Sequence, residues 1–352
     1  MKYLFFGTQK PGISLPHFLA QIKPYLETMS AEKITIPLVI NSMTFDVQIT
    51  RLSGGMTNGS YKIQTTAGQW VLRLAGEGTN SFIDRRAELI NSIVAGSLDL
   101  YAPIVWGQPA TGNLLTRYLD HCSPLSEAKL NKSKYLHMVA ASFKKLHAGT
   151  DFSKPVQVFD RNAEYMKVIA SKNPGFLNRS DIQAIIAQIG DLEKLLNAYS
   201  VPMVRCHNDP NPTNFLILTS QDGRGQKKEL KLLDWEYSSN NDFLWDLVYF
   251  IYLSQLSPEL TDLFLKAYFD QPTEEIMAWL ELYKPLVGWW LVLWSWVQIV
   301  NESTSCSQSE YRKLAEKSLQ ETQDLLQSAS FQQAFELLSS QRLACGPTFR
   351  GF

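Results

Sequence analysis

The chain has 352 residues, of which 45% are hydrophobic and 19% are charged. This length and composition suit a globular protein with a sizeable core, and we expect two domains or one two-lobed unit. The 33 Lys and Arg residues nearly balance the 34 Asp and Glu residues and leave a formal net charge of -1. No basic field is therefore available to gather nucleic acid or anionic lipid, and we expect neither partner.

The cysteine pattern and the apolar runs indicate a cytoplasmic protein. The four cysteines lie far apart and form neither a zinc motif nor a disulfide framework: Cys122, Cys206, Cys306 and Cys345. The start, MKYLFFGTQKPG, has an apolar run that is too short for a secretory signal. The longest uncharged stretch, residues 285–301, falls short of the roughly 20 residues that cross a bilayer. We expect a buried helix there and no integral membrane segment.

The N-terminal third is predicted to be rich in β-structure, after a helical extension over residues 1–33. The runs ITIPLVI, FDVQITRL, SYKIQTT and QWVLRLA are rich in β-branched and aromatic residues and are separated by turn signals. They predict an antiparallel meander over residues 34–74. Residues 81–97 have a helical pattern, and PIVWGQ with NLLTRYL predicts two further strands around the turn PATGN.

Helical patterns dominate after Tyr118. Amphipathic helices are predicted over residues 126–148 and 180–198. Two strand-like runs, NFLIL and LKLLDWEY, follow around the loop SQDGRGQKKE. From Asp246 to about Ser340 the pattern is helical again. Three prolines are expected to interrupt it: Pro258, Pro272 and Pro285.

These patterns together predict an α+β fold. We place a small β-rich lobe at residues 34–118 and a larger, mostly helical lobe at residues 119–352. No internal repeat interrupts this division.

The strongest local signal is the run CHNDPNPTNFLIL. Its His207, Asp209 and Asn214 form an HxDxxxxN pattern, and Asp234 in LLDWEY follows Asn214 by twenty residues. An aspartate on a tight loop can accept the proton of an attacking hydroxyl, and Asn and Asp oxygens suit a magnesium ion held against phosphates. The alternative is that Asp209 and Asn214 only stabilise turns in a Pro-rich loop. Asp234 favours the catalytic interpretation, because it closes the hairpin that begins at Asn214.

The chain resembles the small-molecule kinases with a protein-kinase-like fold, which include choline and ethanolamine kinases, thiamine kinase and aminoglycoside phosphotransferases. It is most similar to the choline kinase branch, through RLSGGMTNGSYKI, VLRLAGEGTNSFIDRRAE, FKKLHAGTDF, HNDPNPTNFL, DWEYSSNN and LWSWVQ, in that order. The resemblance implies a two-lobed phosphotransferase that uses ATP and Mg²⁺. It also implies that Asp209 is the catalytic base, that His207 braces its loop, and that Asn214 and Asp234 hold magnesium.

The resemblance places the nucleotide in the β-rich lobe. In SGGMTN, residues 53–58, glycines would let backbone amides approach the phosphates, although a GG turn is also an ordinary hairpin turn. Arg73 occupies the strand position where protein kinases have a phosphate-contacting Lys, and Glu88 could orient it as an ion pair. The alternatives are an exposed strand arginine and a surface glutamate. The adenine hinge is expected at residues 116–119. The candidate nucleotide-binding residues are Ser53, Gly54, Gly55, Asn58, Arg73, Glu88, Thr116 and Tyr118.

A ring of aromatic residues suits a cationic alcohol. A quaternary ammonium has no N–H for a carboxylate and is best held by aromatic faces, at about 0.5 to 2 kcal/mol each. By resemblance, Tyr237 and Trp294 match the choline cage, and Trp290 lies one helical turn before Trp294. Glu236 could add negative charge, or could instead bond to the backbone. The alternative for Trp290 and Trp296 is an ordinary core position.

We therefore predict a kinase for a small cationic alcohol, with choline as the leading candidate. Thiamine kinase and aminoglycoside phosphotransferase are alternatives that share the catalytic residues, and a nucleotide-binding pseudokinase is an alternative of another class. Two departures from the family pattern keep these alternatives open. The family usually has two tryptophans three apart, the first of which falls on Leu291, and Pro210 stands where the family mostly has Leu. The sequence is compatible with a homodimer.

Overall fold

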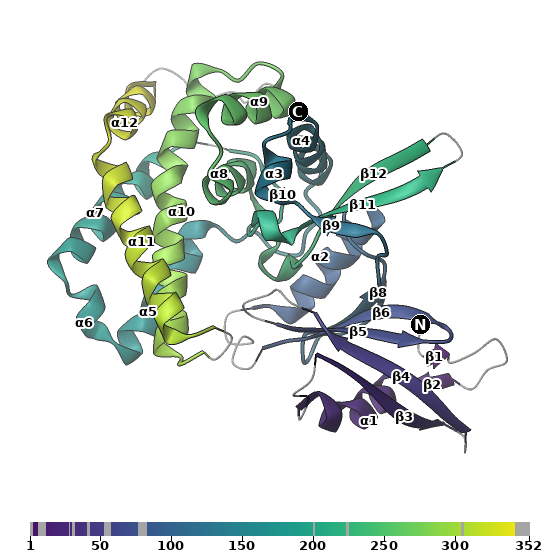
Figure 1. Cartoon of the computed structure of the whole chain (residues 1–352). Coiled ribbons are helices and arrows are strands. Elements are labelled where there is room, and N and C mark those ends of the chain that lie inside the picture. Colours follow the sequence, from purple (N-terminus) through teal and green to yellow (C-terminus); the bar gives the residue numbers. More distant parts are fainter. Residues whose placement is uncertain are drawn as a thin grey trace. The chain divides into compact units, whose positions relative to one another are not determined.

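The structure, a computed structural model, describes residues 3–5, 12–27, 29, 32–40, 43–52, 58–76, 83–199, 201–222, 225–303 and 306–341. The chain forms two compact units (Figure 1). The first comprises Met1–Ser123 and Leu216–Glu236, and the second comprises Pro124–Phe215 and Tyr237–Phe352. The first contains most of the β-structure and the second most of the helices, which confirms the predicted α+β class.

The first unit is built on a six-stranded antiparallel sheet with the order β3-β4-β5-β6-β8-β7. In that order the strands are Lys33–Ile40, Met43–Arg51, Gly59–Thr65, Gly68–Leu74, Asn113–Arg117 and Ile104–Gln108. The predicted meander is therefore confirmed. Its alternation buries Val47, Ile49 and Leu72 in one core with Phe18 and Ile22 of α1 (Leu15–Glu27).

The first unit also contains a short hairpin before the sheet and a helix between β6 and β7 in sequence. A short hairpin of β1 (Tyr3–Phe5) and β2 (Gly12–Ser14) precedes α1. Helix α2 (Arg85–Ser97) begins after Asp84, whose side chain accepts hydrogen bonds from the N–H groups of Arg86 and Ala87. The helix therefore starts later than the predicted residue 81, and residues 81 and 82 lie outside the described part.

A second sheet has the order β12-β11-β9, from Gly225–Leu232, Phe215–Asp222 and Cys122–Pro124. The prediction of a ten-residue loop in this hairpin is wrong, because both strands continue into SQDGRGQKKE. Polar residues in an exposed hairpin can form strands, because their backbone groups can hydrogen-bond to the neighbouring strand instead of to water. The run LKLLDWEY also ends as a strand at Leu232, and a short 3₁₀ helix follows at Trp235–Tyr237.

The second unit is mostly helical. Its helices are α3 (Glu127–Leu130), α4 (Ser133–His147), α5 (Val158–Lys172), α6 (Pro174–Leu177), α7 (Ser180–Leu196), α8 (Phe243–Ser254), α9 (Pro258–Phe269), α10 (Glu274–Val300), α11 (Gln308–Gln327) and α12 (Ala329–Gln341). The single helix predicted over residues 126–148 is wrong, because Lys132 has an extended backbone and separates α3 from α4. The strands β10 (Met203–Cys206) and β13 (Ser239–Asp242) pair antiparallel beside the HxD motif.

Helix α10 is the core of the second unit. It packs against α5, α8, α11 and α12. Pro285 lies inside it and does not end it, contrary to the prediction. The proline ring is buried, so packing offsets the missing backbone hydrogen bond, which costs about 3 kcal/mol in an exposed helix.

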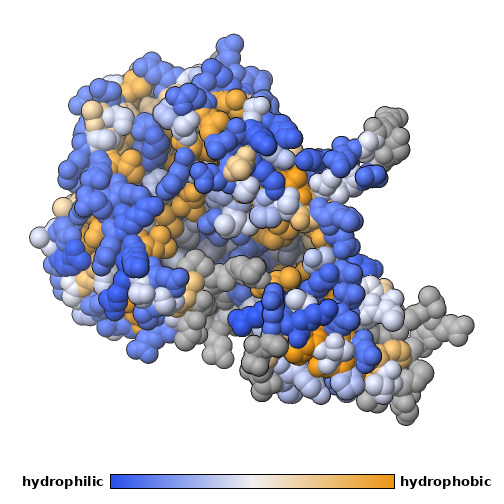
Figure 2. Space-filling model, viewed as in Figure 1, coloured by the Kyte–Doolittle hydropathy of each residue, from blue (hydrophilic) through white to orange (hydrophobic). Residues whose placement is uncertain are grey.

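The length and composition of α10 would also allow it to cross a membrane, but 78% of its most apolar window is buried inside the protein, as in a core helix. On the face that Figure 2 draws, the described hydrophobic residues lie in scattered groups among hydrophilic ones. The predicted buried helix at residues 285–301 is confirmed.

Candidate active site

The HxD motif forms a tight loop in the second unit, between β10 and the 3₁₀ helix Pro212–Asn214. Asn208 has a left-handed backbone with φ of 66°, which asparagine tolerates better than most residues. The backbone N–H of Asp209 donates to Nδ1 of the fully buried His207 at 3.3 Å. The amide of Asn214 donates to the backbone carbonyl of Asp209 at 3.0 Å. The structure thus brings the three predicted motif residues together.

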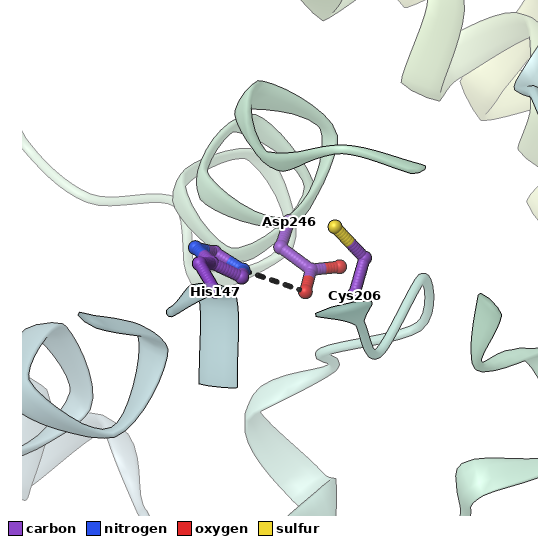
Figure 3. A group of neighbouring side chains, drawn as sticks. All are labelled: His147, Cys206 and Asp246. Atoms are coloured by element: carbon purple, nitrogen blue, oxygen red, sulfur yellow. Dashed lines mark hydrogen bonds and ion pairs between the residues drawn. The ribbon is translucent and has the colours of Figure 1, made fainter. Parts of the chain in front are cut away.

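The loop is supported by Asp246 of α8, a residue that sequence reasoning did not select. Its buried carboxylate accepts hydrogen bonds from the backbone N–H groups of His207 and Asn208, both at 2.7 Å. Nε2 of His147, on α4, lies 3.2 Å from the same carboxylate (Figure 3). Nδ1 of His147 lies 2.8 Å from the hydroxyl of Tyr268. The sequence did contain a signal for Asp246, which is the single charged residue within the apolar run FLWDLVYF. A charged side chain is buried only when it has hydrogen-bonding or ionic partners.

Cys206 completes the buried group in Figure 3. Potential ligand atoms of His147, Cys206 and Asp246 lie within 4.8 Å of one another. Burial, followed by the nearby carboxylates of Asp246 and Asp242, raises the pKa of the Cys206 thiol well above its usual value, so the thiol stays protonated. Both oxygens of Asp246 already accept backbone hydrogen bonds. This group is therefore a hydrogen-bonded support for the loop.

Tyr249 is a second residue that sequence reasoning missed. Its hydroxyl donates to Oδ1 of Asp209 at 2.6 Å. Burial, followed by the charge of Asp209, raises the pKa of Tyr249 well above its usual value, so the phenol remains a donor. Tyr249 lies one helical turn after Asp246, so α8 holds both the backbone of the loop and the carboxylate of Asp209.

The predicted aromatic residues meet in the same unit. The rings of Tyr237 and Trp290 contact edge to face at 5.7 Å between centroids, and Trp290 contacts Tyr249 in the same way at 5.6 Å. The indole N–H of Trp294 donates to the hydroxyl of Tyr237 at 3.2 Å. Trp296, in contrast, is half-buried and stacks on Phe176, with 4.1 Å between the ring centroids.

The first unit holds a compact group of charged residues. Arg73 of β6 forms an ion pair with Glu88 of α2, as expected, and donates to Oδ1 of Asp234 at 3.0 Å. Burial opposes the charge of the guanidinium, but the carboxylates of Glu88 and Asp234 outweigh it and raise the pKa of Arg73. Arg73 is buried, which excludes the alternative of an exposed strand arginine.

Asn58, Arg85 and Glu236 complete this group. The Glu236 carboxylate accepts hydrogen bonds from Asn58 at 2.8 Å and from Arg85 at 3.2 Å. Arg85, which sequence reasoning missed, also pairs with Glu88 at 2.9 Å. One oxygen each of Glu88, Asp234 and Glu236 could meet at a cation, since they lie within 4.8 Å of one another. The two arginines compensate much of the negative charge there.

The remaining residues predicted to bind the nucleotide are Ser53, Gly54, Gly55, Thr116 and Tyr118. Ser53, Gly54 and Gly55 lie outside the described residues. Thr116 lies in β8, paired with both neighbouring strands. The backbone N–H of Tyr118 donates to the carbonyl of Gln69 at 3.2 Å, and the ammonium of Lys62 lies 3.9 Å from the centre of the Tyr118 ring.

Comparison with known proteins supplies the family. The sequence profile described as choline/ethanolamine kinase matches residues 49–323. The chain belongs to the choline/ethanolamine kinase family. It therefore belongs to a family of phosphotransferases, and the family named from the HxD, DWEY and LWSW motifs is confirmed.

Individual members of the family agree with this assignment. Protein LicA of Haemophilus influenzae is 30% identical over 221 residues, which cover 62% of this chain and 62% of LicA. The solved choline/ethanolamine kinase family protein of Mesorhizobium loti has a TM-score of 0.69 at 23% identity, over 83% of this chain and 92% of its own. A LicA solved in complex with AMP has a TM-score of 0.66 at 21% identity, over 88% and 98% of the two chains. At these identities the solved structures show the shared fold.

Proposed function

We propose that the protein is an ATP- and Mg²⁺-dependent kinase that phosphorylates the hydroxyl of a small cationic alcohol, with choline as the leading candidate. The main support for this proposal is that hydrogen bonds fix the position of the Asp209 carboxylate. Tyr249 fixes one of its oxygens, Asn214 holds its backbone carbonyl, and Asp246 holds the loop before it. A base fixed in this way can accept the proton of an attacking alcohol as the bond to the phosphoryl group forms.

We propose that Arg73, Asn58 and Asp234 serve the nucleotide and its metal. Arg73 is held by Glu88, in the way expected of a cation that contacts phosphate oxygens. The donors proposed for Mg²⁺ are the amide oxygen of Asn214 and the carboxylate of Asp234, and hard oxygen donors of this kind fit that ion. The ion would neutralise charge on the β- and γ-phosphates. The complex of a related LicA with AMP supports an adenine nucleotide.

The aromatic group around Tyr237 supports a cationic substrate. We assign Tyr237, Trp290 and Trp294 to the head group of the alcohol, because aromatic faces attract a quaternary ammonium and need no N–H from it. Glu236 bonds to Asn58 and Arg85, so we propose that it orders the charged group of the first unit. A cytoplasmic location suits this substrate and remains our prediction.

A panel assay tests the proposed function. ADP release is measured with ATP, Mg²⁺ and one acceptor at a time: choline, ethanolamine, thiamine or kanamycin. We expect the highest kcat/KM with choline and loss of turnover when EDTA removes the metal. Preference for thiamine or kanamycin would contradict choline as the substrate, and nucleotide binding without turnover of any acceptor would favour a pseudokinase.

A further inference from the structure

The ring of Tyr237 already has a cation beside it. The guanidinium carbon of Arg161, on α5, lies 4.7 Å from the centre of the Tyr237 ring. This distance is within the range of a cation–π contact, and arginine is the side chain that most often makes one. Among the described residues, no carboxylate pairs with this guanidinium. The position that we assign to the head group of the substrate is therefore filled by a side chain of the protein.

The recess beside Arg161 is small. Arg161 lines a small recess together with Val156, Asn208, Trp245 and Trp290. The recess has a volume of about 10 Å³, which is enough for about one water molecule. None of the described residues that line this recess is acidic. A quaternary ammonium is too large for this recess, and the positive charge of the guanidinium repels it at short range.

From these contacts we infer that Arg161 is a specificity-determining residue that competes with the substrate for the face of Tyr237. This inference rests on the proposed function. The arginine side chain must leave the ring before a cationic alcohol binds, and its departure opens the recess. Glu164, exposed and one turn further along α5, offers a carboxylate to the displaced guanidinium. A neutral alcohol would displace Arg161 poorly, because it cannot replace the lost cation–π contact.

Calorimetric titration of the full-length protein with tetramethylammonium tests the competition without any turnover. Arg161→Met keeps a long apolar stem and removes the charge, and we expect it to bind tetramethylammonium about tenfold more tightly than the wild type. Arg161→Lys keeps a cation and serves as the matched control, with affinity close to that of the wild type. The KM for choline should fall in Arg161→Met by a similar factor.

The outcomes separate this inference from the proposed function. Unchanged or weaker binding of tetramethylammonium to Arg161→Met, in a variant whose circular dichroism matches the wild type, would overturn the competition. If the wild type phosphorylates choline and Arg161→Met shows no gain, only the role of Arg161 fails. If no acceptor is phosphorylated but Arg161→Met gains affinity for the cation, only the proposed reaction fails.

Discussion

Asp209 illustrates how a single residue is prepared for a reaction. A free aspartate on a loop would spread over several rotamers, and the rotamer entropy lost on ordering would reduce its use as a base. Here the Tyr249 hydroxyl donates a hydrogen bond to Oδ1 at 2.6 Å, and the Asn214 amide donates one to the backbone carbonyl at 3.0 Å. We assign the other oxygen, Oδ2, which lies 3.5 Å from the side-chain amide nitrogen of Asn214, to the substrate hydroxyl.

Removal of the Tyr249 hydroxyl should affect the base without affecting the nucleotide. We expect Tyr249→Phe to lower kcat about tenfold or more and to move the acidic limb of the pH–rate profile to higher pH, because the charged form of Asp209 loses a donor. Nucleotide affinity should stay within about threefold. Tyr252→Phe is the matched control, since this tyrosine of the same helix donates its hydroxyl hydrogen bond to Glu321 at 2.5 Å. An unshifted pH profile in Tyr249→Phe would contradict its positioning role.

The motif residues could be predicted at this scale, but their supports could not. His207, Asp209 and Asn214 share one short run, so their spacing alone indicates a common loop. Asp246 and Tyr249 lie more than thirty residues further along the chain, and Arg85 and Glu236 are separated by 151 positions. Only the packing of α8 against β10, and of α2 within the first unit, brings such partners together.

At the scale of elements, α8 begins with a buried carboxylate. Asp242 caps the helix by accepting a hydrogen bond from the backbone N–H of Leu244 at 2.8 Å, and it also accepts one from Tyr283 of α10. Burial raises the pKa of Asp242 from 3.8 to about 6, and these two hydrogen bonds only partly counteract the shift. Between pH 3.8 and about 6 the folded protein therefore binds more protons at this residue than the unfolded chain does.

This proton linkage predicts the direction of the pH dependence. The contribution of Asp242 to the free energy of unfolding should fall by about 3 kcal/mol as the pH rises from below 4 to above 6, because deprotonation is less favourable in the folded state. Asp242→Asn should remove that fall while keeping an acceptor for the helix cap. Urea unfolding from pH 4 to 7 measures the difference between the two proteins. A difference that is constant with pH would contradict the assignment.

The errors of prediction at this scale have physical causes. Pro285 was expected to interrupt the helical pattern, but burial of its ring in α10 outweighs its local preference. The polar run SQDGRGQKKE was expected to form a loop, but β11 and β12 extend into it from either side, and polarity alone does not distinguish an exposed hairpin from a loop.

At the scale of the whole molecule, each compact unit holds its own group of candidate residues. Asn58, Arg73 and Asp234 belong to the first unit, and Asp209 and Tyr237 belong to the second. The chain passes between the units on either side of the β11–β12 hairpin, directly after Phe215 and directly after Glu236. The twenty residues that separate Asn214 from Asp234 in the sequence therefore correspond to the β11–β12 hairpin.

The most direct test of the kinase assignment compares phosphoryl transfer and nucleotide binding in Asp209→Ala. Transfer to choline should fall by about 10³-fold or more, while the Kd for ATP stays within about threefold, because the base acts on the alcohol in the transition state. Asp262→Ala, which removes an exposed carboxylate that pairs with Lys266 on α9, is the control and should retain full activity. Transfer by Asp209→Ala at close to the wild-type rate would contradict the account.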